Sequence, residues 1–162
     1  MSDQSMDTDQ TSAVPVSQAR RKSNMAVLAE ATPQAIAEKL TLLGDLPAHD
    51  VIRVPETGLV MVRGRTGGTG SPFNLGEVTV TRCVVRLASG ETGSSYIVGR
   101  HKQHAHDAAL IDALWQHPEL TETVEASVIS PLKSDQQGHR QQVAEETAAT
   151  RVDFFTMVRG DD

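Results

Sequence analysis

The block from residue 51 to residue 87 constrains the fold most, because apolar β-type runs flank a glycine-rich loop there. The loop, TGGTGSPFN at 66–74, suits a reversal of chain direction because glycine accepts backbone conformations that other residues avoid. A second turn at 89–93 leads into another β-type run. The expected strands lie at 51–54, 59–63, 77–87 and 95–99. Successive hairpin links of this kind predict an antiparallel meander of about four strands.

Three details within these runs predict local structure. Pro55 is expected to end the first strand, because proline cannot donate a backbone hydrogen bond. The first four residues of the run 59–63 are apolar at every position, which predicts a strand covered on both faces. In the third run the apolar positions change parity between Val80 and Cys83, which predicts a bulge near Thr81–Arg82.

Helical patterns flank the β-type runs on both sides. From Gln18 the apolar spacing is helical, and Thr32 followed by Pro33 has the pattern of a helix start. Gly44 is expected to end that second helix. A third helix is predicted over 102–116, with Ala108, Ile111, Leu114 and Trp115 on its apolar side. The fold class expected is therefore α+β, a meander with helices before and after it.

The composition along the chain divides it into four parts. They are a disordered leader at 1–17, a single α+β domain at 18–130, a polar linker or helix at 131–150, and a docking segment at 151–162. The docking segment contains the apolar residues Phe154, Phe155 and Met157 after a polar stretch. Such a segment packs either on its own domain or on a partner, and the pattern favours neither.

The overall composition excludes several classes of protein. The net charge of −6 disfavours a nucleic-acid-binding protein, which is usually basic. The single cysteine, Cys83, rules out an internal disulfide. We expect a cytoplasmic protein, because there is neither a signal peptide nor an apolar run of the ~18 residues that a membrane span needs. Aromatic residues are only 3% of the chain, which limits the core and favours help from a partner protein.

The glycine-rich loop is also the best candidate for chemistry. Glycine lets backbone N–H groups approach an anion, and arginine adds charged donors that suit phosphate oxygens. The spacing fits neither a P-loop nor a dinucleotide-binding fingerprint, and a plain hairpin loop with exposed arginines is the favoured alternative. Seven basic and three acidic residues between Arg53 and Lys102 give that stretch a net charge of +4. The candidates for an anion-binding or shared site are Arg63, Arg65, Gly67, Gly68, Gly70, Asn74, Glu77, Arg82, Arg100 and His104.

Other constellations give weaker signals. His101, His104 and His106 cannot bind one metal ion from a helix, because at about 100° per residue His106 points away from the other two. No serine lies in a nucleophile elbow, and Cys83 reads as a buried thiol within an apolar run. We therefore predict neither a catalytic residue nor a metal site in this chain.

The block PETGLVMVRGRTGGTGSPFNLGEVTVTRCVVRL, residues 55–87, resembles the PhnG family of the bacterial carbon–phosphorus lyase system. The likeness extends to four other segments. These are MAVLAEA at 25–31, GSSYIVGR at 93–100, AALIDALWQ at 108–116 and VDFFTMVRG at 152–160. The resemblance covers about residues 20–117 and the last ten or so residues.

The resemblance implies a subunit of a transferase. Proteins of the PhnG family act with PhnH, PhnI and PhnL to make α-D-ribose 1-methylphosphonate 5-triphosphate, as an alkylphosphonate displaces adenine from MgATP. PhnG, PhnH, PhnI and PhnJ form a core complex, with ATP-binding proteins of the PhnL and PhnK type as further partners. The resemblance implies no cofactor for this chain, with MgATP as the substrate of the complex, and a PhnI-like surface for Phe154, Phe155 and Met157.

Two interpretations of the chain's own role remain open. It is either an interaction subunit that shapes a partner's active site, or it contributes phosphate-binding residues to a shared one. An independent histidine-dependent metal enzyme is a distant third. The first two differ on whether the glycine-rich loop meets protein or nucleotide.

Overall fold

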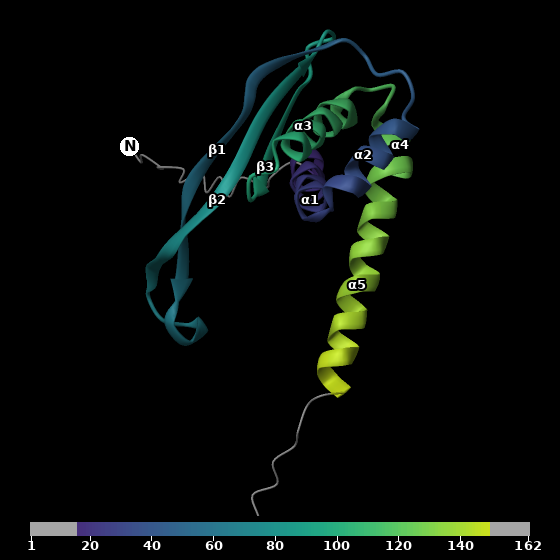
Figure 1. Cartoon of the computed structure of the whole chain (residues 1–162). Coiled ribbons are helices and arrows are strands. Elements are labelled where there is room, and N and C mark those ends of the chain that lie inside the picture. Colours follow the sequence, from purple (N-terminus) through teal and green to yellow (C-terminus); the bar gives the residue numbers. More distant parts are fainter. Residues whose placement is uncertain (1–15, 150–162) are drawn as a thin grey trace, which may run out of the picture.

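Three antiparallel strands form one sheet, and the helices gather on one side of it (Figure 1). The computed structural model describes residues 16–149. The strands are β1 (His49–Arg65), β2 (Pro72–Leu87) and β3 (Thr92–Val98), in the order β1-β2-β3. The helices are α1 (Val16–Glu30), α2 (Pro33–Leu42), α3 (Lys102–Gln116), α4 (Thr121–Val124) and α5 (Ser130–Ala149), with short turns η1 (Thr66–Gly68) and η2 (Glu125–Ile129).

The predicted α+β meander is confirmed, but it has three strands instead of four. The runs 51–54 and 59–63 belong to the single strand β1, which passes through Pro55 without ending. The register with β2 shifts between Arg53 and Glu56, so Pro55 lies in an irregular part of the ladder. β1 is at the edge of the sheet, where a residue without an N–H is tolerated.

The bulge predicted at Thr81–Arg82 is wrong. β2 pairs with β3 in unbroken register from Val80 to Arg86, and the extra residues lie in β1, on either side of Arg53. Thr81 faces the helices like Cys83, and its hydroxyl donates a 2.7 Å hydrogen bond to the Gly99 carbonyl. The change of parity in the sequence arises because a polar residue occupies one core position.

The second N-terminal helix, α2, begins and ends where the sequence predicts. The Thr32 hydroxyl accepts a hydrogen bond from the Ala35 amide, and Gly44 has a φ of 71° just past the end of α2. α1 begins at Val16, two residues before the predicted start at Gln18 and inside the predicted leader, whose residues 1–15 lie outside the described part of the chain. The segment 151–162, with Phe154, Phe155 and Met157, lies outside it as well.

The last three helical elements follow one another without a break. α4, the π-helical turn η2 and α5 run from Thr121 to Ala149, so the stretch left open as linker or helix is helical through residue 149. Pro131, in the first turn of α5, lacks the N–H that an α-helix would use there. A π turn directly before a proline accommodates the missing hydrogen bond and the crowding of the ring. Between residues 16 and 149, no helix is long and apolar enough to cross a membrane.

Helix α3 is the centre of the core. The predicted helix over 102–116 is confirmed, and Ala108, Ile111, Leu114 and Trp115 are all buried. It packs on β2 and β3, while α1 and α2 pack against it in turn. Almost every residue from His104 to Trp115 is buried, so α3 is enclosed by the sheet on one side and by helices on the other.

An ion pair of Asp112 joins α1 to α3 and β3. The buried carboxylate of Asp112 accepts from Arg21 Nη2 at 2.7 Å, Arg21 Nε at 3.0 Å and the Ser94 amide at 2.9 Å. This bonding raises the pKa of Arg21. Arg21 Nη2 also donates to the Thr92 carbonyl, so one guanidinium reaches two elements. A buried charge that is fully paired in this way fixes the position of α1, since removal of either partner leaves the other desolvated.

Gly93 allows the closest approach in the fold. A Cβ atom at this position of β3 would overlap the backbone carbonyl of Ala109 and the backbone amide of Ala113, and would lie 2.9 Å from the Ala113 Cβ. α3 can therefore lie directly on the backbone of β3 only because residue 93 has no side chain.

We expect Gly93→Ala to destabilise the chain by about 3 kcal/mol, because the new methyl group meets rigid backbone atoms rather than a movable side chain. Urea unfolding followed by circular dichroism measures the change. Gly76→Ala is the matched control, since a Cβ in that part of β2 meets nothing within 4 Å. Equal midpoints for the two variants would contradict the close approach.

Candidate functional site

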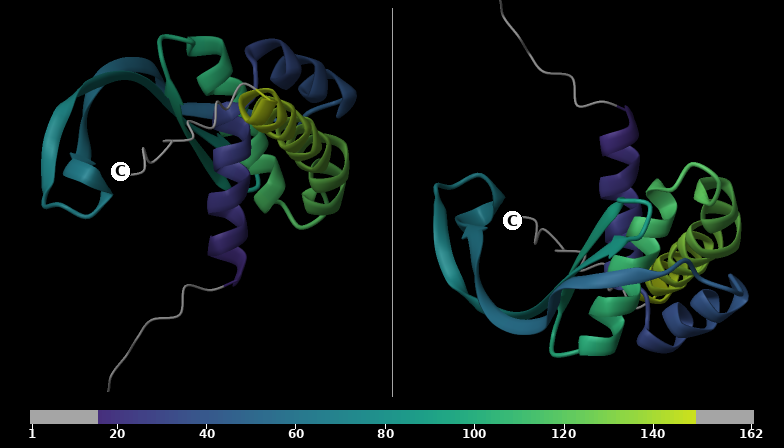
Figure 2. Two further views of the ribbon diagram at one scale, coloured as in Figure 1. Left: turned by 90° about the horizontal axis from the view of Figure 1, so that it is seen from below. Right: turned by 90° about the horizontal axis from the view of Figure 1, so that it is seen from above.

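The β1–β2 hairpin extends far beyond the rest of the sheet. β2 pairs with β1 from Leu87 to Pro72, but β3 accompanies β2 only as far as Val80. Residues 59–79 therefore form a two-stranded ribbon, which we name the hairpin arm. Figure 2 shows this arm curving away from the helices. The arm has two parts with different surfaces. The tip is residues 65–72, and the shaft is the paired residues 59–64 and 73–79 on either side of it.

The shaft of the arm carries exposed apolar residues on both faces, and Thr79 and Glu77 share the face of Leu59 and Met61. Val60 and Val78 are paired in the register, and Leu59 and Met61 alternate with them on the opposite face, which continues the core-facing side of Thr81. Leu59 is 64% exposed and Leu75 is 66% exposed, and the other large apolar residues of the shaft are also exposed: Val60, Met61, Val62 and Phe73. The prediction that the run 59–62 is covered on both faces is thus wrong for the described part of the chain.

The tip of the arm is closed by its own backbone. η1 carries Gly67 at a φ of 60° and Gly68 at a φ of 80°, values that favour glycine. The Gly70 amide donates to the Thr66 carbonyl at 2.9 Å, and Arg65 Nη1 donates to the Gly70 carbonyl at 3.2 Å. The Gly70 amide is therefore engaged in the turn and does not point at an external anion.

Several of the predicted site residues come together at this tip. Arg63 pairs with Asn74 in the register, one step from the turn, and Glu77 pairs with Met61 further down the shaft. Arg63, Asn74 and Glu77 are all exposed. No ion pair involves Arg63 or Arg65 within residues 16–149, so two arginines are available at the end of the arm.

Arg82 lies in the body of the sheet instead of at the tip. Its Nε donates to Glu56 Oε1 at 2.7 Å, and it pairs with Tyr96 across the β2–β3 ladder. Hydrogen bonds to Tyr96 and to Glu56 raise the pKa of Arg82. The three residues cross all three strands on the face that the helices leave bare. This arrangement serves strand pairing, and Arg82 is occupied by protein partners.

The remaining two candidates lie apart from the tip as well. Arg100 is exposed just after β3. His104 is 3% exposed in α3, and its Nε2 donates to the Leu28 carbonyl at 2.8 Å. Because a carbonyl only accepts, this bond fixes the proton on Nε2. His104 therefore holds α1 against α3, and it is not open to an anion in this chain.

The cysteine and histidine side chains do not form a reactive centre in the described structure. Cys83 is fully buried, its Sγ donates to the Arg53 carbonyl at 3.3 Å, and burial raises the pKa of the thiol. A thiol with a raised pKa is a poor nucleophile. Within residues 16–149, no three His, Cys, Asp or Glu side chains are placed to hold a metal ion.

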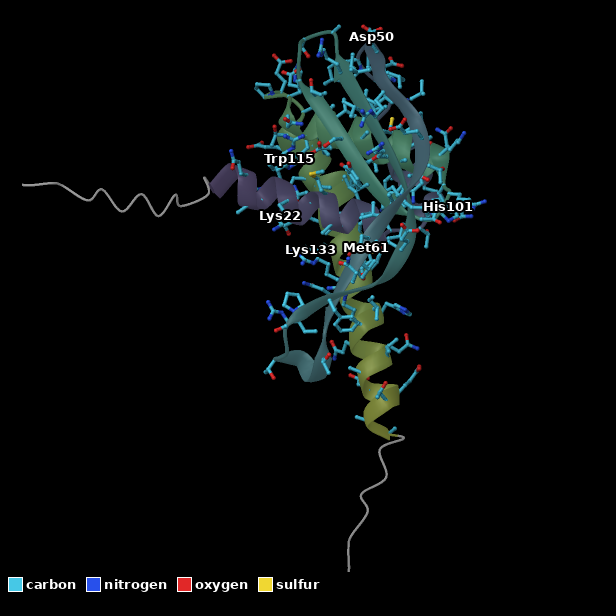
Figure 3. All side chains as sticks on the ribbon, turned by 90° about the vertical axis from the view of Figure 1, so that its left-hand side faces the viewer. Lys22, Asp50, Met61, His101, Trp115 and Lys133 are labelled. Atoms are coloured by element: carbon cyan, nitrogen blue, oxygen red, sulfur yellow. The ribbon has the colours of Figure 1, made fainter. Side chains whose placement is uncertain are left out.

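The sequence did not predict that the hairpin extends beyond the sheet as an uncovered arm. It grouped Arg82 and His104 with the loop, although the fold separates them from it. It also expected the apolar run of β1 to be covered. Figure 3 shows Met61 on the ribbon where it runs toward the tip, with Asp50 at the opposite end of the molecule. The sequence feature that could have predicted the arm is a hairpin with apolar residues on both faces that ends in a glycine-rich turn.

Comparison with known proteins fits this architecture. The family model described as "Phosphonate metabolism protein PhnG" matches residues 19–160. The chain belongs to the PhnG family. A relative from Rhizobium meliloti (strain 1021) is 47% identical over 147 residues, which cover 89% of this chain and 92% of the relative. That relative is named alpha-D-ribose 1-methylphosphonate 5-triphosphate synthase subunit PhnG. The PhnG match includes the whole hairpin arm.

Proposed function

We propose that this chain is a subunit of α-D-ribose 1-methylphosphonate 5-triphosphate synthase. The observation that carries the proposal is the 47% identity to a subunit of that name over nearly the whole of both chains. Identity at that level, over 89% of this chain and 92% of the relative, supports a shared place in the same assembly.

The reaction transfers the ribose triphosphate of MgATP to a phosphonate. The bond between C1′ and the adenine nitrogen breaks, a bond from C1′ to a phosphonate oxygen forms, and adenine leaves with a proton. The resemblance to the PhnG family supports PhnH, PhnI and PhnL as the subunits that act together in this step. The same resemblance supports PhnJ and PhnK as further members of the assembly, which works in the cytoplasm. MgATP and the phosphonate are substrates of the assembly, and this chain needs no cofactor of its own.

Within that assembly we assign this chain a structural or anion-binding role. Arg63 and Arg65 supply positive charge at the end of a long arm, without acidic partners in the described chain. Guanidinium groups bind triphosphate and phosphonate oxygens in bidentate fashion. The tip is thus suited to reach a nucleotide bound by a neighbouring subunit, as a contribution to a shared site.

Omission of the chain tests the subunit role. We expect the assembly of the other synthase subunits, purified without this chain, to release adenine from MgATP and methylphosphonate far more slowly than the complete assembly. The chain alone should release none, because in this proposal the chemistry is completed by the other subunits. Adenine is measured by liquid chromatography. Turnover by the isolated chain, or full turnover without it, would contradict the proposal.

The variant Arg63→Ala/Arg65→Ala tests the tip separately. We expect intact assembly with adenine release about 10- to 100-fold slower, since a hydrogen bond to a charged group contributes about 1.5–3 kcal/mol. Arg86→Ala is the control, an exposed arginine in the body of β2. Intact assembly and full turnover in the double variant would remove the anion-binding role and leave the structural one.

A further inference from the structure

The shaft of the hairpin arm is uncovered on both faces, although a two-stranded ribbon in water is marginal by itself. Val60 and Val62 are exposed on one face, and Leu59 and Met61 are exposed on the other. An exposed apolar edge strand of this length is an aggregation hazard unless something covers it. The exposed apolar residues of the shaft therefore favour a cover on each face.

Two glycines leave one face of the arm without side chains near its apolar residues. The face with Val60 and Val62 also carries Gly58 and Gly76, which pair with Val80 and Val62 in the register. A Cβ atom at either glycine would meet nothing within 4 Å. Neither glycine has a φ in the left-handed region, so the backbone of the chain does not demand glycine there. Glycine inside a strand often marks a place where another backbone comes close.

The size of the shaft matches a stable interface. The shaft, residues 59–64 and 73–79, forms a ribbon roughly 20 Å long at about 3.3 Å per residue. Covering both of its faces buries on the order of the 800 Å² per partner that specific protein complexes need. The last segment of this same chain, residues 151–162, is too short to cover both faces, because one extended segment lies on one face or along one edge.

We propose that the shaft inserts into an apolar groove of another subunit of the synthase, which covers both faces. The proposal rests on the proposed function for the existence of that partner. The partner offers apolar side chains to Leu59 and Met61 on one wall of the groove. Its other wall brings backbone close to Gly58 and Gly76. The shaft thus anchors the subunit, the tip with Arg65 extends beyond the groove, and Arg63 lies at the end of the shaft next to the tip.

Two double variants of the full chain test the two faces. Val60→Thr/Val62→Thr keeps the β-branched shape of one face, and Leu59→Gln/Met61→Gln makes the other face polar. Leu42→Gln is the matched control, since Leu42 is 69% exposed at the end of α2. Each tagged variant is titrated against the assembly of the other synthase subunits, and circular dichroism checks its fold.

We expect each double variant to bind about tenfold or more weakly, because each loses two buried apolar contacts. The control should bind like the unaltered chain. Unchanged binding by both double variants would overturn the proposal. Weakening by only one would also overturn it, since a surface that covers one face is not a groove. Failure of the unaltered chain to bind any synthase subunit would instead overturn the proposed function.

Photo-crosslinking tests the same proposal without a polar substitution in the arm. A photoreactive amino acid replaces Phe73, which is 44% exposed on the arm, in the complete assembly. We expect crosslinks to another synthase subunit. Crosslinks to residues 151–162 of the same chain, or to a second copy of it, would contradict the proposal even if a double variant failed to fold.

Discussion

The contact of α3 with β3 determines the rest of this structure. Gly93 removes the side chain that would hold the helix away from the strand, and Asp112 on the same helix bonds the Ser94 amide next to it. Arg21 of α1 forms the ion pair with Asp112, and this pair holds α1 next to the contact between α3 and β3. Because α3 is then enclosed by sheet and helices, the core is complete without a contribution from the hairpin arm.

This arrangement leaves the arm outside the core. The helices use one side of a three-stranded sheet, and β3 ends its pairing with β2 at Val80, so the longer strands continue alone. The bare face of the body carries the Glu56, Arg82 and Tyr96 row, which is polar and satisfied within the sheet. The apolar side chains of the shaft beyond it are exposed. The same face of the body also carries Val98, which is 68% exposed, so the contrast with the shaft is one of degree.

Local signals in the sequence predicted much of the body. The Thr32 cap, the stop at Gly44 and the apolar spacing in 102–116 act within one turn of a helix, and each was confirmed. The errors came from interactions distant in sequence. Pro55 does not end β1 because β2 pairs on both sides of it. Thr81 occupies a core position because its hydroxyl donates a hydrogen bond to the Gly99 carbonyl.

The candidate site was predicted in part, for a related reason. The tip and its arginines follow from one contiguous segment, and the fold keeps them together. Arg82 and His104 were predicted as site residues only from their charge and residue type. The Arg21–Asp112 pair joins residues too far apart in the sequence for any local pattern to predict it. The apolar shaft was expected to be covered, and that expectation holds only if the cover comes from outside the described chain.

Hydrogen exchange followed by mass spectrometry tests the division into body and arm most directly. In the isolated chain, amides of α3 and β3 should exchange slowly, and those of residues 59–79 should exchange quickly, as in an unsupported ribbon. In the assembled synthase the arm should become protected, while α3 changes little. Strong protection of the arm in the isolated chain, or no change on assembly, would contradict the account.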